Sequence, residues 1–488
     1  MLFNSYAYIF LFIPVTLVIY FLLNRLRLTI GSKLWLLLAS LLFYGWWNPV
    51  YLPLIAGSIV FNYLVGRLIS RLRDKGQFSY SRCFLAIGIL GNLALLGYFK
   101  YTDFLISNVN SIGHFSLPLL QIVLPLGISF FTFTQIAYLV DTEKGKVKEY
   151  SPLNYGLFVT FFPHLLAGPI IHHAEMMPQF DRSRKKVVDY RNLASGICLF
   201  FIGLFKKLVI ADTFAVWANN GFGAVNELTV IQAWVTSLAY TLQLYYDFSG
   251  YTDMALGSSL MFNIKLPINF NSPYRSLDIQ EFWRRWHITL GRFMRDYVYI
   301  PLGGNKVSEG RILLNLMITF FIVGLWHGAG WTFVLWGCMH GAALVIYRLW
   351  KRSGLSLPSW IAWFITFNFV NAGWVFFRAK TLDDAVLMLK GMVGMNATVL
   401  PKGIGTRLLH IDGFAPALDD LLRKLGSNSK VIVCMFIIFL PLSFLLKNSN
   451  ELTESFRPNI IQLILFVLVA WLSVLFLGTY SEFLYFRF

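Results

Sequence analysis

Two of the eight histidines in this chain have neighbours that suggest chemistry. His327 follows the apolar run 312–326 and opens the sequence Trp-His-Gly-Ala-Gly-Trp, which ends at Trp331. Glycines between two apolar runs allow close backbone approach and leave room for a ligand. Trp326 and Trp331 would wall such a site, and an imidazole with a pKa near about 6.5 can act as a general base on a hydroxyl. We predict a catalytic His327, with a structural core histidine as the alternative.

His287 lies in a different pattern. Asp278 can cap a helix, and Glu281 takes the capping-box position three residues later. The following positions form an apolar stripe of Phe282, Trp286, Leu290 and Phe293 and a polar stripe of Arg285, Thr289, Arg292 and Asp296. This periodicity predicts one continuous amphipathic helix at a membrane surface. His287 is at the border of the stripes, and an ordinary interfacial histidine is the alternative to a functional one.

A third feature is Tyr246-Asp247-Phe248-Ser249, where an acid ends an apolar run. Asp247 could accept a proton, orient a histidine or pair with an arginine, and the last, structural role is favoured. The remaining histidines carry weaker signals. His164, His172 and His173 flank a Gly-Pro break at 168–169 and could line an entrance, although a loop role is favoured, and His340 is expected in the core.

Several classes of chemistry are disfavoured by missing motifs. The sequence has no phosphate-binding G-x-x-x-x-G-K-[ST], no dinucleotide-binding G-x-G-x-x-G before a helix and no G-x-S-x-G. The four cysteines (Cys83, Cys198, Cys338 and Cys434) lack metal-ligand spacing. We therefore expect no bound metal or cofactor.

The elements that must hold these residues are transmembrane helices. Hydrophobic residues make up 57% of the 488 residues, and charged residues only 13%. A soluble protein of this size could not cover its surface with so few charges. The net charge of +17 does not indicate a nucleic-acid partner, because the basic residues occupy short loops between apolar runs.

The apolar runs predict an all-α polytopic membrane protein with about eleven to thirteen spans. The runs are 7–24, 34–48, 51–66, 83–99, 118–140, 193–215, 229–246, 312–326, 331–349, 360–377, 431–446 and 459–478. The interrupted run 155–171 is expected to be a re-entrant or broken helix. Residues 379–430 are expected to form a small extramembrane insertion, and 431–488 a C-terminal pair of spans.

Basic clusters predict the topology. Residues 25–33, 67–82, 144–148, 182–191 and 284–295 are rich in Lys and Arg, whereas the connection 48–52 is uncharged. The positive-inside rule places these clusters in the cytoplasm and the N-terminus outside. The same cations could attract an anionic donor such as a coenzyme A phosphate, although an orienting role is favoured for most.

Taken together, these motifs resemble the membrane-bound O-acyltransferases (MBOATs), most closely the bacterial alginate O-acetyltransferase branch. The resemblance rests on Tyr246–Tyr251, Phe282–His287, Arg295–Tyr297, Tyr299–Asn305, Trp326–Gly328, Ala167–Ile170 and Leu2–Ser5. It is densest over residues 240–345 and collinear from residue 1 to about 380, so the whole chain is expected to form one MBOAT membrane domain.

The resemblance implies a multi-helix bundle of MBOAT type with re-entrant helices and a central tunnel or funnel, in which His327 is essential and His287 is the second active histidine. Substrate contacts are expected from Trp326, Trp286, Arg285, Asp247, Tyr246 and Ser249. The donor would be a cytoplasmic thioester, with acetyl-CoA favoured. The acceptor would be an extracytoplasmic polysaccharide such as alginate, reached through a periplasmic acetyltransferase partner, and the location would be the bacterial inner membrane.

Three alternatives remain open at the level of the sequence. The acceptor could be peptidoglycan or another exopolysaccharide. It could be teichoic acid, with a D-alanyl group delivered by a carrier protein. The chain could also be a transporter without acyl turnover, built from broken helices around a midplane site.

Overall fold

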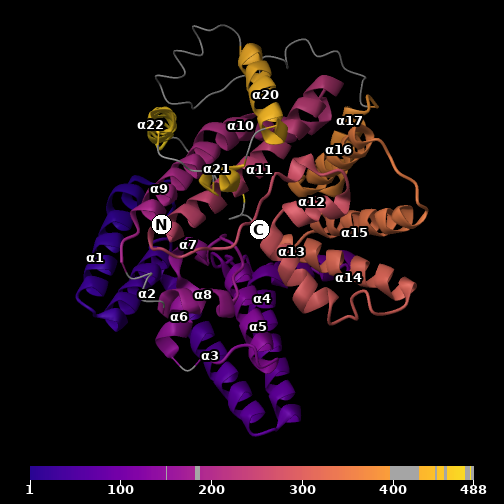
Figure 1. Ribbon diagram of the computed structural model, residues 1–488. Coiled ribbons are helices and arrows are strands. Elements are labelled where there is room, and N and C mark those ends of the chain that lie inside the picture. Colours follow the sequence, from indigo (N-terminus) through magenta and orange to yellow (C-terminus); the bar gives the residue numbers. More distant parts are fainter. Residues whose placement is uncertain are drawn as a thin grey trace. The chain divides into compact units, whose positions relative to one another are not determined.

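The computed structural model describes residues 1–149, 151–181, 187–395, 428–445, 448–454, 459–478 and 484. Over these residues the secondary structure is helical, and the predicted all-α membrane fold is confirmed (Figure 1). The expected insertion at 379–430 falls largely outside the described residues. Its first part forms the helix α17, Leu382–Met392, which begins with a capping box between Thr381 and Asp384.

The chain forms two compact units. Unit 1 comprises Met1–Phe200 and Met254–Ile268, and unit 2 comprises Phe201–Asp253 and Asn269–Phe488. The helices of unit 1 are η1 Ala7–Phe12, α1 Ile13–Arg25, α2 Thr29–Gly45, η2 Pro49–Tyr51, α3 Leu52–Asp74, α4 Phe78–Gly113, α5 Ile128–Glu143, α6 Pro152–Thr160, α7 Phe162–Leu165, α8 His173–Asp181 and most of α9 Tyr190–Phe205.

Unit 2 contains the residues that the sequence marks for chemistry. Its helices are η4 Lys206–Ala211, α10 Asp212–Gly223, η5 Val225–Glu227, most of α11 Val230–Met261, η6 Pro273–Arg275, α12 Ile279–Arg285, α13 Ile288–Met294, η7 Arg295–Tyr299, α14 Glu309–His327, α15 Trp331–Arg352, α16 Ser359–Arg378, α17, α20 Asn428–Leu445, α21 Ser449–Glu454 and α22 Ile460–Leu475.

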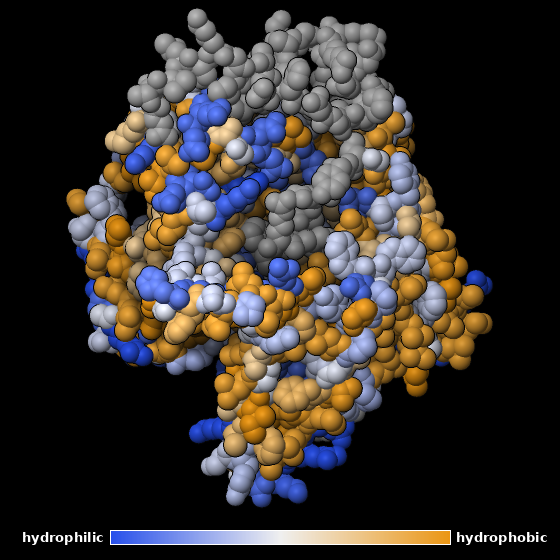
Figure 2. All heavy atoms as spheres, turned by 180° about the vertical axis from the view of Figure 1, so that it is seen from behind, coloured by the Kyte–Doolittle hydropathy of each residue, from blue (hydrophilic) through white to orange (hydrophobic). Residues whose placement is uncertain are grey.

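Within the described residues, seven helical segments are long and apolar enough to cross a membrane: Ala7–Arg25, Pro49–Asp74, Phe78–Gly113, Tyr190–Gly223, Glu309–His327, Trp331–Arg352 and Ser359–Arg378. Three further apolar helical segments in this described part of the chain are shorter: Thr29–Gly45, Cys434–Leu445 and Ile460–Leu475. The predicted run 229–246 falls on α11, whose side chains are mostly buried inside the protein. Of the predicted run 118–140, only residues 128–140 are helical, on the buried helix α5, whereas 118–127 are non-helical and mostly exposed or half-buried. Apolar side chains cover much of the visible surface in Figure 2, as expected where lipid is the solvent.

The predicted break within 155–171 is present in unit 1. Helix α6 ends at Thr160, α7 adds a single turn, and non-helical backbone follows through Gly168. All side chains of this stretch from Tyr155 onward are buried. Interrupted backbone is therefore packed in protein, which is the condition for tolerating it at membrane depth.

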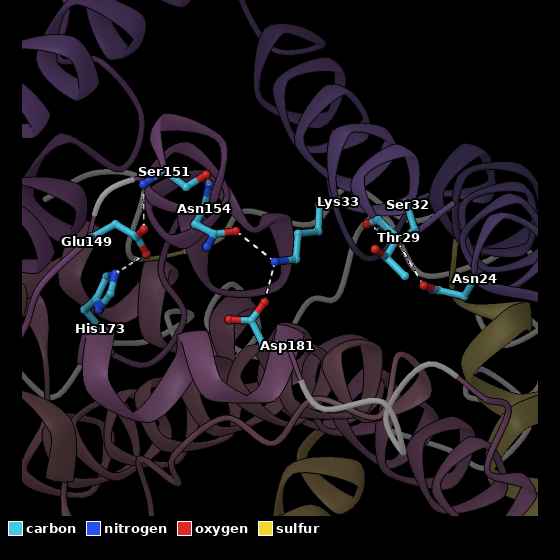
Figure 3. A network of polar contacts seen from close by, with 9 residues as sticks. All are labelled: Asn24, Thr29, Ser32, Lys33, Glu149, Ser151, Asn154, His173 and Asp181. Atoms are coloured by element: carbon cyan, nitrogen blue, oxygen red, sulfur yellow. Dashed lines mark hydrogen bonds and ion pairs between the residues drawn. The ribbon is translucent and has the colours of Figure 1, made fainter. Parts of the chain in front are cut away.

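A polar network closes the ends of these short helices (Figure 3). The Lys33 ammonium, on α2, donates to the Asn154 side chain at 2.9 Å and pairs with Asp181 at 2.5 Å. The Glu149 carboxylate accepts the Ser151 backbone N–H at 2.8 Å and contacts His173 Nε2 at 3.1 Å. Ends of α2, α6 and α8 are thus tied together by side chains from segments far apart in sequence.

Candidate active site

His287 lies at a break between α12 and α13, so the single amphipathic helix predicted from the periodicity is wrong. Its backbone is left-handed, with φ of 43°, and Trp286 before it is extended. The predicted cap is confirmed, because the Asp278 carboxylate accepts the Glu281 N–H at 2.7 Å. In a continuous helix, adjacent residues point about 100° apart. The break instead buries Trp286 and His287 together, with 2% and 0% exposed.

The segment 269–271 supports this strained turn. The Ile288 N–H donates to the Asn269 carbonyl and the Asn271 N–H donates to the Arg285 carbonyl, both at 3.0 Å. The Asn269 side chain accepts the Thr289 hydroxyl at 2.6 Å. A left-handed non-glycine residue persists only where its surroundings fix it. These bonds hold the backbone in place on both sides of His287.

His327 is the last residue of α14, which packs tightly against α15. A Cβ at Gly324 would overlap the Phe333 carbonyl, and one at Gly337 would overlap the Phe320 carbonyl. A Cβ at Gly328 would overlap the Phe333 ring, so this glycine makes room for Phe333 and not for a ligand. The glycines therefore set the close approach of two helices, which fixes the position of His327.

The two predicted histidines are brought together in unit 2. Their ring centroids lie 6.4 Å apart, and Trp326 lies 4.9 Å from His327 and 6.0 Å from His287. The His327 side chain is buried as well, with 2% exposed. Trp326 lines the pair as predicted, but Trp331 is 57% exposed and does not wall it, because it starts α15 pointing outward.

Other aromatic rings complete the surroundings of the pair. Phe248, on α11, packs edge-on against His287 at 4.8 Å, and Trp336 and Phe377 each lie 5.1 Å from His327. Burial lowers the pKa of His287 to about 3, so its imidazole is neutral at physiological pH. Two imidazoles at this separation can contact one reacting group, in surroundings that exclude water.

Asp247 and its neighbours lie on α11, next to Phe248. The Asp247 carboxylate pairs with the Lys207 ammonium at 2.7 Å and accepts the Leu484 N–H at 3.2 Å. The Tyr246 hydroxyl bonds the Ser443 hydroxyl at 2.9 Å, and Ser249 is buried. Asp247 thus pairs with a cation, although with a lysine where the sequence analysis considered an arginine. A substrate role for these three residues remains a prediction.

Arg285 and Trp286 are the two residues that precede His287 in the chain. The Arg285 guanidinium pairs with Glu281 at 2.8 Å and donates to the Asn271 carbonyl at 3.1 Å. The Trp286 ring packs against Trp374 at 4.9 Å and Phe270 at 5.1 Å. Both side chains thereby hold the α12 end in place, and their substrate contacts also remain a prediction.

A cleft of about 840 Å³ is lined by side chains of α12, α13, α14 and α15, and its described lining includes neighbours of the two histidines but neither histidine itself. Its lining includes Ile288, the residue after His287, and Val323, one helical turn before His327. Six cations line it and no carboxylate does: Arg284, Arg292, Arg295, Arg348, Lys351 and Arg352. Asp296 and Glu309 neutralise part of this charge through ion pairs. Across the described residues, Arg284 and Lys351 have no carboxylate within 4 Å, which leaves the cleft basic.

Sequence reasoning identified three of these cations, Arg284, Arg292 and Arg295, but missed those on α15. Arg348, Lys351 and Arg352 end a long apolar run, where basic residues usually mark only the membrane boundary. Trp336 was missed too, since a tryptophan within an apolar helix gives no signal of its own. Its spacing of four residues from His340 does place both on one helix face.

The known proteins that are similar to this chain include several acyltransferases. The membrane-bound O-acyltransferase family, MBOAT, matches residues 119–382. A peptidoglycan O-acetyltransferase of Helicobacter pylori is 46% identical, covering 100% of this chain and 98% of that protein. A probable alginate O-acetylase of Pseudomonas aeruginosa is 42% identical over 80% of this chain and 75% of that protein. A teichoic acid D-alanyltransferase of Bacillus subtilis is 30% identical over 52% of this chain and 69% of that protein.

Proposed function

The chain belongs to the membrane-bound O-acyltransferase family, and we propose that it transfers acetyl groups from a cytoplasmic thioester to hydroxyls of an extracytoplasmic polysaccharide, with peptidoglycan as the acceptor. The buried His287–His327 pair beside a basic cleft is the observation that carries the proposal. Peptidoglycan is preferred to alginate because the peptidoglycan relative matches the full chain, whereas the alginate relative leaves a fifth of it uncovered.

The chemistry follows from the two imidazoles. His327 takes the proton of the acceptor hydroxyl as its oxygen attacks the thioester carbonyl. The new C–O bond forms, the C–S bond breaks, and the proton passes to the leaving thiolate to give a thiol. The His287 ring is neutral at physiological pH, and it holds the acyl group by hydrogen bonding. The Phe248 and Trp326 rings hold the imidazole in place before the reaction, which reduces the reorganisation that the transition state requires.

The cleft supports a polyanionic donor. Coenzyme A carries a diphosphate and a further phosphate, and six cations against two neighbouring carboxylates provide matching charge. Arginine suits phosphate oxygens through its planar pairs of N–H donors. Because the cleft reaches Ile288 and Val323, a donor seated there presents its thioester end near both histidines. We therefore propose that acetyl-CoA enters from the side of this cleft.

The first acceptor hydroxyl could belong to the glycan itself or to a periplasmic acetyltransferase that passes the acetyl group on. The transfer chemistry at His327 is the same in both cases. A requirement for a second protein would show as acetylation in cells but not by the purified chain. The reading of the chain as a transporter without acyl turnover is set aside, because the family is one of acyltransferases.

The test is ester-linked acetate on purified peptidoglycan from cells that depend on this chain for it. We expect acetate in cells with the unchanged protein and at least a hundredfold less with His327→Ala at equal protein level. The matched control is His114→Asn, which alters an exposed histidine. Normal acetate in His327→Ala would contradict the mechanism, and acetate on alginate instead of peptidoglycan would contradict the acceptor.

A further inference from the structure

A third histidine, His340, lies close to the pair and is not used by the proposed chemistry. It is on α15 and fully buried, with 0% exposed. Its Nδ1 accepts the indole N–H of Trp283 at 3.2 Å. In the described part of the chain, this is the one hydrogen bond that the His340 side chain makes. A single directional contact of this kind suggests that His340 serves Trp283.

Trp283 is also a wall of the basic cleft. It lies on α12, and its ring packs against Phe320 of α14 at 4.9 Å and Trp336 of α15 at 5.8 Å. Indole N–H groups are donors only, and they need an acceptor when water is removed. The His340 Nδ1 atom is that acceptor, so the bond fixes the angle at which the indole faces the cleft.

Trp336 connects this arrangement to the catalytic histidine. Its ring centroid lies 4.8 Å from His340 and 5.1 Å from His327, and it is almost perpendicular to the His327 ring, at 88°. Gly373 on α16 admits the His340 ring, because a Cβ there would approach its Nε2 to 3.2 Å. Each ring thus packs against the next, from Trp283 to His340, from His340 to Trp336 and from Trp336 to His327.

We propose that His340 is a positioning residue that orients Trp283 as the inner wall of the donor cleft, so that the acyl thioester points at His327. The proposal rests on the proposed function, since it assigns the cleft to the acyl donor. Accepting a hydrogen bond at Nδ1 requires that the neutral His340 ring carries its own proton on Nε2. A leucine at this position would fill the space but leave the indole N–H without its acceptor.

The test is the Kd of labelled acetyl-CoA for the purified, detergent-solubilised full chain. His340→Leu and Trp283→Phe should each weaken binding about three- to tenfold, the effect of one neutral hydrogen bond. His340→Asn, whose amide oxygen can replace Nδ1 as acceptor, should bind within about twofold of the unchanged protein. Trp234→Phe is the matched control, because it loses an indole bond to the Met392 carbonyl away from the cleft.

The double variant decides between a coupled and an independent role. If His340 acts through Trp283, Trp283→Phe with His340→Leu should bind no more weakly than either single variant. The proposal would be overturned if the Kd of the double variant rose by the product of the two single effects. Equal weakening of binding by His340→Asn and His340→Leu would also overturn it. If His340→Leu fails to fold, the same cycle is run with His340→Asn, where Trp283→Phe must weaken binding as it does in the unchanged protein. If the unchanged protein does not bind acetyl-CoA at all, the donor assignment fails, which is a different outcome.

Discussion

Unit 1 and unit 2 both contain buried histidines, but with different partners. In unit 1, His173 contacts the Glu149 carboxylate at 3.1 Å and His164 contacts the Phe158 carbonyl at 3.0 Å. In unit 2, the His287 and His327 rings lie 6.4 Å apart, centroid to centroid, within a group of aromatic rings. Each of these unit 1 imidazoles contacts an oxygen atom, whereas aromatic rings surround the unit 2 pair, and Ile288 and Val323 near that pair line the cleft. Burial alone therefore does not identify the chemically active histidine.

The largest effect is expected from His287. His287→Asn removes the imidazole next to His327 and keeps a polar side chain that tolerates the left-handed backbone. Acetyl transfer should fall by about a hundredfold or more, the usual contribution of a positioned acid–base group, with unchanged thermal stability. The measurement is the initial transfer rate at matched protein level. A rate within a few-fold of the unchanged protein would show that one imidazole is sufficient.

The polar contacts of unit 1 should affect stability and leave chemistry intact. Glu149→Gln weakens the contact to His173 but keeps an acceptor for the Ser151 N–H. We expect a fall of several degrees in the melting temperature in detergent, with the transfer rate per folded molecule unchanged. A loss of rate without a loss of stability would place unit 1 in the chemistry and remove the contrast between the units.

The charge of the cleft gives a smaller effect that depends on salt. Arg284→Gln with Lys351→Gln removes two cations that lack carboxylates within 4 Å in the described structure. Acetyl-CoA should bind several-fold more weakly at low salt, and the difference should shrink in high salt because screening weakens the attraction that the two cations provide in the unchanged protein. The control is Arg311→Gln. Arg311 is an exposed residue of α14 that does not line the cleft, so this variant should bind acetyl-CoA normally.

The smallest effect concerns pH. The pKa of His287 is about 3 in the folded protein and about 6.5 when unfolded, so the unfolded chain binds an extra proton between these values. Its contribution to stability is present above pH 6.5 and is lost as the pH falls toward 3. The melting temperature of His287→Asn should therefore drop less than that of the unchanged protein between pH 7 and pH 5. Equal drops in the two proteins would contradict the burial of a neutral His287.

Much of the fold and the central pair follow from sequence. Local sequence patterns are sufficient to predict the apolar runs, the broken segment 155–171 and the Trp-His-Gly context of His327. The break at His287 was not predicted, because the residues of 279–294 have helical periodicity. It is imposed by hydrogen bonds from 269–271, which no local pattern encodes. The same holds for Trp331, whose outward direction depends on how α15 begins.

The cleft and the third histidine were harder to foresee for a related reason. Arg348 and Lys351 come from the end of α15, while Arg284 and Arg292 come from α12 and α13. Their shared position exists only after the helices pack. His340 was expected to be a core residue, and it is buried, but its bond to Trp283 spans 57 residues of sequence. Periodicity shows which face is buried and not which side chains meet there.

The most direct test of the central claim is a transfer experiment with membrane vesicles whose cytoplasmic face is accessible. Labelled acetyl-CoA is added to that face, and label on the acceptor is counted for the unchanged protein, His327→Asn and the control His114→Asn. We predict label with the unchanged protein and the control, and label at background with His327→Asn although acetyl-CoA still binds. Full transfer by His327→Asn would contradict the account, because the proton of the acceptor would then have to leave through another group.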